Sequence, residues 1–420
     1  MRILLLGEYS NVHNTLAKGL RHLGHDVTVA SNGDFWKDYP RDQDLARRPG
    51  KLGGLALMAK VATLLPRWRG YDVVQLINPM FLELKAERIM PVYRYLRRHN
   101  RRVVLGAFGM DYYWVNECVQ RRPLRYSDFN IGDQLRTDDI AMTDRRDWTG
   151  TPKAELNKFI AADCDAIVTG LYEYDVCYRP NFPEKTTFIP FPIDTAQAAP
   201  AAPPTQAPPA APPPAPPAGG RGVVTLKAEM KRKDYILPSP PREGSGERLG
   251  GLGSGLMGSG QLRLFIGLSR GRSVYKGTDI MLRAAKAVEA RYPDRLHLTV
   301  AEGLPFNEYQ RLMNGADVIM DQLYSYTPAM NALLAMSKGI VVIGGGEPEN
   351  YDILGEKELR PIVNVQPTEE SVRHELEQLV LHPERLPLLK QQSIEYVRRH
   401  HDYIKVARQY EQLYQMINER

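Results

Sequence analysis

The sequence predicts an α/β protein with two doubly wound parallel β-sheets, one in each half of its 420 residues. In both halves, short apolar strand segments alternate with helical stretches, a pattern typical of parallel strands covered by helices on both faces. The length exceeds what one ordinary hydrophobic core accommodates. Because parallel strands present their carboxyl ends to ligands, we expect the two sheets to face each other across a cleft.

The strand assignments rest on short apolar runs of three to six residues. In the first half, strands are expected at 2–6, 25–30, 72–77, 102–105, 165–169 and 187–190. In the second half, they are expected at 264–268, 296–300, 318–320, 340–343 and 362–365. The clearest helices are expected at 15–23, 278–291, 307–314, 328–338 and 369–381, with a strongly helical tail over 387–418.

The domain organisation follows from a change in composition. Residues 196–260 are rich in Pro, Ala, Gly and Ser, and such a segment buries too little apolar surface to offset the entropy of ordering. We expect a disordered insertion there, between an N-terminal domain (1–195) and a C-terminal domain (261–400). A Pro-rich recognition segment is the alternative. The last helix, 401–420, is expected to pack back on the N-terminal domain.

Several classes of protein are excluded by the sequence. No run approaches the ~20 apolar residues of a membrane span, and RILLL at the start predicts a buried strand instead of a signal peptide. The three cysteines (Cys118, Cys164 and Cys177) are far apart, which predicts a reducing, cytoplasmic setting with neither disulfides nor a metal site. The turn after the first strand, GEYSNVHN, holds one glycine and no GxGxxG, and the P-loop motif GxxxxGK[ST] is absent from the sequence.

The net charge of +6 is modest, and much of it lies in local clusters such as RYLRRHNRR. Basic clusters attract anionic lipid or nucleic acid, but they are also common at solvated helix ends. The sequence carries no nucleic-acid recognition signature, so we expect no nucleic-acid partner.

A basic loop follows the strand expected at 264–268. The loop, SRGRSVYKGTD, presents Arg270, Arg272 and Lys276 at the carboxyl edge of the second sheet. Guanidinium and ammonium groups placed there can offset the charge of a departing diphosphate. A solvated basic loop is the alternative interpretation.

Two further segments end at the same sheet edge. In SYTPAMNALLAM, Thr327 is the expected N-cap and Pro328 the first helical residue, and the free N–H groups of a helix start bind anions. In IGGGEPENYD, Gly345 and Gly346 allow a ligand close to the backbone. The acids that follow, Glu347 and Glu349, can accept hydrogen bonds from sugar or ribose hydroxyls. A well-formed helix start and a tight turn are the alternatives.

Together these segments resemble the group 1 (family 4-like) glycosyltransferases of the GT-B superfamily. The similarity covers nearly the whole chain outside the insertion, from ILLLGEYSNVHNTLAKGLRHLGHDVTV to ADVIMDQLYSYTPAMNALLAMSKGIVVIGGGEPENY. It implies the GT-B fold, in which two Rossmann-like domains face a cleft. It also implies that Arg270 or Arg272, together with Lys276, holds the donor diphosphate.

The resemblance implies further donor contacts. It places Gly7, in the turn after the first strand, and the backbone of Thr327, Pro328, Ala329 and Met330 beside the donor. It makes Glu349 the glutamate of the family's glycine-glycine-x-Pro-Glu run.

The chain departs from the family at the positions of two glutamates spaced eight apart. Tyr326 and Leu334 stand at those places, so the E-x7-E motif is degenerate and ribose binding must come from elsewhere, with Glu347 as a candidate. In the first half, GAFGMDYYW retains only Asp111 as an ionisable group. Asp111 is the candidate acceptor-side orienter or base; the alternative is a buried aspartate that caps the following turn.

The resemblance implies transfer of a sugar from a UDP- or GDP-sugar donor to a glycan or lipid-linked acceptor, in bacterial surface polysaccharide synthesis. It implies retention of configuration, no metal and no cofactor. Residues 51–69 (KLGGLALMAKVATLLPRWR) are amphipathic with basic ends and either touch the inner face of an anionic plasma membrane or cover the sheet. The alternatives are a non-catalytic sugar-nucleotide-binding subunit, a nucleotide-sugar epimerase on the same fold, and a Pro-rich adaptor.

Overall fold

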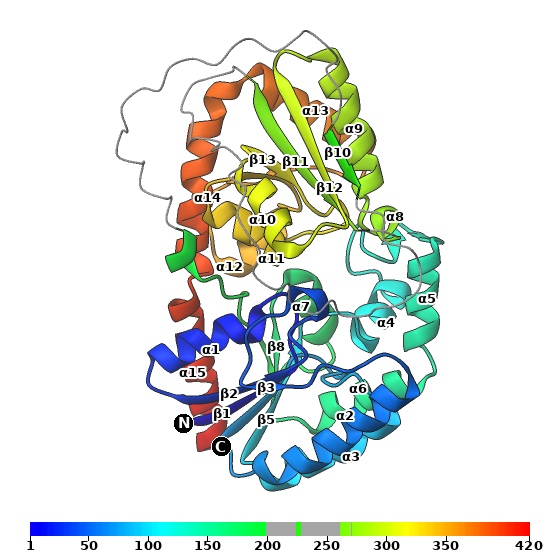
Figure 1. The fold of residues 1–420 in the computed structure, drawn as a ribbon, viewed down its shortest axis with the longest axis vertical. Helices are drawn as coiled ribbons and strands as arrows, with labels where there is room; N and C mark the ends of the chain where they lie inside the picture. The colour runs from blue at the N-terminus through cyan, green and yellow to red at the C-terminus, as the bar shows by residue number, and fades with distance from the viewer. Residues whose placement is uncertain (199–223, 228–260, 270) are drawn as a thin grey trace, which may run out of the picture.

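Two parallel β-sheets, one from each half of the chain, organise the computed structural model (Figure 1). The structure describes residues 1–198, 224–227, 261–269 and 271–420. Each sheet is covered by helices and forms its own Rossmann-like domain, and the expected α/β fold class is confirmed.

The N-terminal sheet has seven strands, all in parallel register with their neighbours. Its inner strand β1 is an apolar run in which Ile3, Leu4, Leu5 and Leu6 are fully buried, as expected for a strand covered on both faces. In order across the sheet, the strands are β3 (Gln43–Asp44), β2 (Asp26–Ser31), β1 (Arg2–Leu6), β4 (Val73–Leu76), β5 (Arg102–Ala107), β8 (Ala166–Thr169) and β9 (Thr186–Phe188).

The C-terminal sheet has six strands and is also parallel throughout. In order, they are β10 (Val224–Lys227), β12 (Leu296–Glu302), β11 (Leu262–Leu268), β13 (Val318–Met320), β14 (Val341–Gly344) and β15 (Val363–Asn364). Alternate residues of β11 enter opposite layers: Leu264 and Ile266 join one apolar cluster, whereas Phe265 joins the other. This alternation is what a doubly wound sheet requires.

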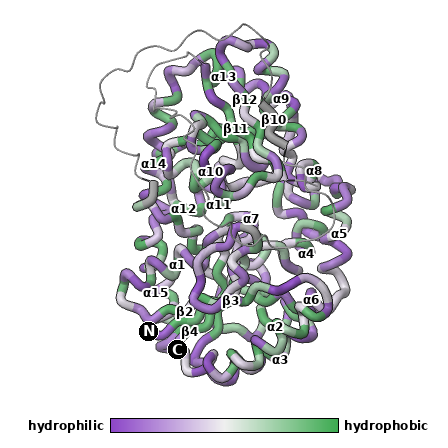
Figure 2. The backbone as a smooth tube through the Cα atoms, viewed as in Figure 1, coloured by the Kyte–Doolittle hydropathy of each residue, from purple (hydrophilic) through white to green (hydrophobic). Residues whose placement is uncertain are grey.

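Fifteen α-helices lie within the described residues. Along the chain, hydrophilic and hydrophobic stretches alternate (Figure 2). The N-terminal domain contains α1 (Val12–His22), α2 (Gly50–Leu64), α3 (Ala86–His99), α4 (Tyr112–Gln120), α5 (Asp139–Trp148), α6 (Pro152–Asp163) and α7 (Tyr172–Tyr178). The second half contains α8 (Ser273–Lys276), α9 (Thr278–Arg291), α10 (Phe306–Asn314), α11 (Met330–Ser337), α12 (Pro348–Leu354), α13 (Glu369–Leu381), α14 (Leu386–His400) and α15 (Tyr403–Glu419).

Some elements differ from the expectation. Strand β3 and a two-stranded hairpin, β6 (Asn130–Ile131) with β7 (Gln134–Leu135), were not predicted. Most of the expected disordered insertion lies outside the described residues, but Val224–Lys227 within it forms β10 and pairs with β12.

The helical tail consists of two helices, since α14 ends at His400 and α15 begins at Tyr403. The side chain of Asp402 caps the new helix by accepting hydrogen bonds from the N–H groups of Ile404 and Lys405. Helix α15 returns to the N-terminal domain (Figure 1) and packs along α1.

Contacts that fix α15 are both polar and apolar. Its Tyr410, Tyr414 and Ile417 are buried, and the Tyr414 hydroxyl donates a 2.5 Å hydrogen bond to Gln75 of β4. At the helix crossing, a Cβ on Gly19 of α1 would lie 2.7 Å from the Cβ of Ala407 and closer still to the backbone of Tyr403. A glycine is therefore needed for the two helices to approach this closely.

No helix within the described residues combines the length and apolar character needed to cross a lipid bilayer.

Gly19→Ala should lower the free energy of unfolding by about 1–3 kcal/mol, because the added methyl overpacks the α1–α15 contact. Chemical denaturation of the full chain measures this change. The matched control is Gly54→Ala in α2, where the new Cβ would meet only the flexible end of Arg47 and helix propensity favours alanine by up to ~1 kcal/mol. Equal stability of the two variants would contradict the packing argument.

Candidate functional site

The strand order of each sheet marks a place where ligands bind. In the C-terminal sheet the chain leaves β11 for β12 on one side, and it leaves β13 for β14 on the other. Loops that part in opposite directions leave a crevice at the carboxyl ends of the strands, which is where doubly wound folds hold nucleotides. The corresponding point of the N-terminal sheet lies between β1 and β4.

The two sheet edges meet at a junction made of loops from both domains. Glu173, just after β8, hydrogen-bonds to Thr327, which lies beyond β13. The ring of Tyr39 contacts Phe306 edge-on, with centroids 5.8 Å apart. The structure therefore brings the predicted second-half segments face to face with the N-terminal domain.

Lys276 ends α8 at the junction, as the basic-loop prediction requires. The backbone N–H of Leu323 donates to its carbonyl at 3.0 Å, so the loops after β11 and β13 are tied together. Burial lowers the pKa of the Lys276 ammonium group, and Asp321 opposes this shift while Arg272 adds to it. No described residue forms a hydrogen bond or ion pair with the ammonium group.

The two arginines of the basic loop are placed differently. Arg270 lies outside the described residues. Arg272 is exposed, and its guanidinium carbon lies 5.4 Å from the centre of the Tyr275 ring. Tyr275 in turn donates a hydrogen bond to Asp128 of the N-terminal domain at 2.8 Å.

The helix after β13 starts later than predicted. The expectation of Thr327 as N-cap and Pro328 as first helical residue was wrong: α11 begins at Met330, and Ala329 is the N-cap. Thr327 instead donates its hydroxyl and its N–H to Glu173, which holds it outside the helix. Ala329 offers no side-chain cap, so the first N–H groups of α11 are left for another acceptor.

Polar side chains surround the start of α11. Asn331 donates to Asp321 at 3.2 Å and accepts from the Tyr309 hydroxyl at 3.3 Å. Burial raises the pKa of Asp321, whereas the charge of Lys276 lowers it. The result is a lysine, an aspartate and an uncapped helix start at the point where the two loops diverge.

The glycines after β14 serve contacts within the protein. A Cβ on Gly345 would collide with the backbone of Ser325, and one on Gly346 would lie 2.8 Å from the side chain of Ile362. Protein atoms therefore occupy the space next to these two glycines, where a ligand was expected.

The acids that follow are also engaged. Glu347 is buried, and its Oε1 accepts from the Tyr126 hydroxyl at 2.5 Å while its Oε2 accepts from Arg125 at 2.7 Å. Burial alone would raise the pKa of Glu347, but hydrogen bonds from Tyr126, Asn364 and Gln366 and the charge of Arg125 hold it below its ordinary value. Glu349 pairs with the same guanidinium at 2.5 Å.

On the N-terminal side, Gly7 follows β1 with φ 84° and packs against Ile77 and Phe81. Asp111 is fully buried. One of its oxygens accepts from the N–H of Trp114 at 2.8 Å, and the other accepts from the Tyr178 hydroxyl at 2.7 Å. This geometry supports the capping alternative for Asp111, since both oxygens are used inside the domain.

Sequence reasoning missed the residues that reach across the junction, which are Arg125, Tyr126, Asp128, Arg136 and Glu173. Glu173 could have been found by the sheet-edge argument, because GLYEYD follows directly on a strand. The other four lie between α4 and α5, where no periodic pattern marks a structural element.

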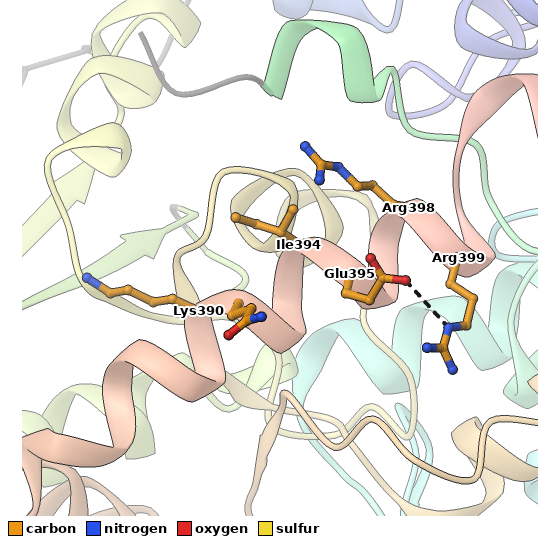
Figure 3. A pocket seen from close by; sticks show the side chains of 6 residues that line it. Lys390, Ile394, Glu395, Arg398 and Arg399 are labelled. Atoms are coloured by element: carbon orange, nitrogen blue, oxygen red, sulfur yellow. Dashed lines mark ion pairs between the residues drawn. The ribbon is translucent and has the colours of Figure 1, made fainter. Parts of the chain in front are cut away.

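Surface hollows are found elsewhere. One of about 600 Å³ lies on α14 and is lined by Lys390, Gln391, Ile394, Glu395, Arg398 and Arg399 (Figure 3). Arg399 is paired with Glu395 and also with Glu356 and Glu358. None of the residues that line this hollow belongs to the diverging loops, so the topology, and not its volume, identifies the candidate site. Among the described residues, no cluster of His, Cys, Asp and Glu is suited to hold a metal ion.

Glu8 provides a pH test of the loop after β1. Burial raises the pKa of Glu8 to about 8, although the N–H groups of His13 and Asn14 bond to it and oppose the shift. Because the folded state then holds this proton more tightly than the unfolded chain, the stability from Glu8 is complete below pH ~4.5 and lost as pH rises through ~8.

The free energy of unfolding of Glu8→Gln, relative to that of the parent, should therefore increase by a few kcal/mol as pH rises from 5.5 to 9. One pKa unit corresponds to ~1.4 kcal/mol. Urea denaturation at several pH values measures the difference. Glu184→Gln, at an exposed site, should show no such trend. A difference in unfolding free energy between Glu8→Gln and the parent that stays constant with pH would contradict the raised pKa of Glu8.

Comparison with solved structures identifies the fold. The chain is similar to HepE of Anabaena in complex with UDP and glucose, with a TM-score of 0.54 and 11% identity over 98% of each chain. It is similar to sucrose-phosphate synthase of Thermosynechococcus elongatus, with a TM-score of 0.55 and 11% identity over 99% of each chain. It is also similar to the catalytic domain of starch synthase IV of Arabidopsis thaliana bound to ADP and acarbose, with a TM-score of 0.52 and 12% identity over all of both chains.

No protein-family model and no curated protein sequence matches this chain. The structural similarity, together with the two facing Rossmann-like domains, shows that the chain has the GT-B fold.

Proposed function

We propose that this protein transfers a glycosyl group from a UDP- or GDP-sugar to a glycan or lipid-linked acceptor. Lys276 and the uncapped start of α11 carry the proposal, because they meet where the loops after β11 and β13 diverge. An ammonium group that forms no hydrogen bond or ion pair with a described residue, beside an uncapped helix start, suits a diphosphate. The structural neighbours bound to UDP or ADP support the choice of ligand class.

In this proposal, catalysis rests on positioning and on charge. Lys276, with Arg272 nearby, offsets the negative charge that builds on the nucleoside diphosphate as the bond to the sugar breaks. Neither a metal nor a cofactor is needed, and the sugar keeps its anomeric configuration. Asp111 contributes by holding α4 in place, an indirect role.

One observation favours a second candidate, a subunit that binds a sugar nucleotide without turning it over. Tyr326, at the position of the family's first glutamate, is buried, and its hydroxyl accepts from the N–H of Arg125 at 2.7 Å. Calorimetric titration with UDP- and GDP-sugars, followed by assays for transfer, separates the candidates. Tight binding without turnover would favour the subunit, and interconversion of the sugar without acceptor would favour an epimerase.

The acceptor side of the proposal includes contact with the inner face of an anionic membrane. Helix α2 buries Leu57 and Val61, but Leu52 and Leu55 on its other positions are 80% and 60% exposed. Lys51, beside them, is also exposed. Exposed leucines next to basic side chains are suited to the interface of an anionic bilayer.

Replacing Lys276 by Ala should weaken UDP binding at least tenfold and remove most of the thermal stabilisation that UDP or a UDP-sugar gives. A ligand at 100 times its Kd stabilises a protein by ~2.7 kcal/mol, so the parent should respond clearly in a thermal-shift panel of nucleotides. Lys286→Ala, at an exposed site on α9, is the matched control. A Lys276→Ala variant that responds like the parent would show that the diphosphate site is misplaced.

The double variant Leu52→Glu, Leu55→Glu should lose most binding to vesicles of phosphatidylcholine with 30% phosphatidylglycerol, as measured by co-sedimentation. The inserted carboxylates remove apolar contact and repel the anionic surface. Leu388→Glu, at another exposed leucine, should sediment like the parent. The membrane contact would be refuted if the parent protein did not bind these vesicles, or if the double variant bound them as well as the parent does.

A further inference from the structure

Glu173 makes an unusual set of contacts for a carboxylate. It lies on α7 of the N-terminal domain, 5% exposed, and reaches the loop ahead of α11 in the other domain. Its Oε1 accepts from the N–H groups of Tyr326 and Thr327 at 2.7 and 3.1 Å, and its Oε2 accepts from the Thr327 hydroxyl at 2.6 Å. The Ser325 hydroxyl is within 2.9 Å of Oε1.

These hydrogen bonds replace a counter-ion. Burial raises the pKa of Glu173, and the hydrogen bonds from Thr327, Ser325 and Tyr326 oppose that shift. No lysine, arginine or histidine among the described residues pairs with it. A buried carboxylate that lost these donors would pay the full cost of desolvation, so Glu173 and the loop are ordered together.

The loop that Glu173 holds determines where α11 begins. Residues 325–327 connect β13 to Ala329, the N-cap, and the Thr327 carbonyl lies 2.7 Å from the Ser325 hydroxyl. With Thr327 committed to Glu173, the helix starts at Met330 with its first N–H groups uncapped. A contact made by one domain thereby sets the geometry of the candidate anion site in the other.

A second cross-domain contact lies on the far side of the same loop. Arg125 is bonded to Glu347 and Glu349, and its guanidinium carbon lies 4.9 Å from the centre of the Tyr326 ring. Arg125 is half-exposed, with 54% of its side chain accessible, whereas its partner Glu347 is buried. Glu173 differs in that it bonds directly to the backbone N–H groups of the loop.

We infer that Glu173 is a positioning residue: from the N-terminal domain it holds residues 325–327 in the conformation that leaves the start of α11 uncapped, and so couples domain contact to nucleotide binding. It touches no substrate itself. The nucleotide part of this inference rests on the proposed function, whereas the ordering of the loop does not.

The test compares Glu173→Ala, Glu173→Gln and the exposed control Glu184→Gln in the full chain. Hydrogen–deuterium exchange without nucleotide reports on the amides of Tyr326 and Thr327, and calorimetry measures UDP affinity. Glu173→Ala should exchange at least tenfold faster across 325–331 and bind UDP at least tenfold more weakly. Glu173→Gln should stay close to the parent, because its amide oxygen can accept from the two N–H groups while its NH₂ donates to the Thr327 hydroxyl.

Exchange in the β1 and β5 peptides, far from the loop, confirms that each variant is folded. Unchanged exchange over 325–331 in Glu173→Ala would overturn the inference, and so would a Glu173→Gln variant as impaired as Glu173→Ala. If the parent binds no UDP, the proposed function fails, and the exchange comparison still decides whether Glu173 orders the loop.

Discussion

The structure depends on the way in which two parallel sheets present their carboxyl edges to each other. Hydrogen bonds within the strands satisfy the backbone of each sheet, but the loops beyond the strands must find partners elsewhere. Here many of those partners come from the opposite domain: Glu173 binds the loop after β13, and Arg125 binds the loop after β14. The interactions that hold the two domains together are therefore the same ones that fix the conformation of these loops.

That arrangement explains why the acids of the second domain are not free. Glu347 accepts hydrogen bonds from Tyr126, Asn364 and Gln366 and is paired with Arg125, so it acts as a structural anchor of the junction. Lys276 is different, because its ammonium group forms no hydrogen bond or ion pair with a described residue, although the charge of Asp321 acts on it. The contrast between hydrogen-bonded carboxylates and an ammonium group without such a partner is what favours this part of the junction as the proposed anion site.

The sequence was most informative where structure is local. Strands such as β1 and β11 were recognisable because their apolar runs are buried on both faces, and Lys276 was identified because it follows such a strand at the sheet edge. The start of α11 was misplaced because Thr-Pro is a strong local capping signal that a partner some 150 residues away overrides. Arg125 and Tyr126 carry no local signal, since their role exists only once the domains meet.

Tyr326, which stands where the resemblance implies a glutamate, has a packing role. It stacks on Tyr172 with ring centroids 5.9 Å apart and joins the apolar cluster that includes Trp114 and Phe129. An aromatic side chain at this position therefore contributes to the packing of the junction.

A crystal structure of the full chain with UDP tests the central claim most directly. The account predicts diphosphate oxygens within hydrogen-bonding distance of the Lys276 ammonium group and of the first N–H groups of α11. A nucleotide bound elsewhere, such as in the hollow on α14, with no ligand atom near Lys276, would contradict the account.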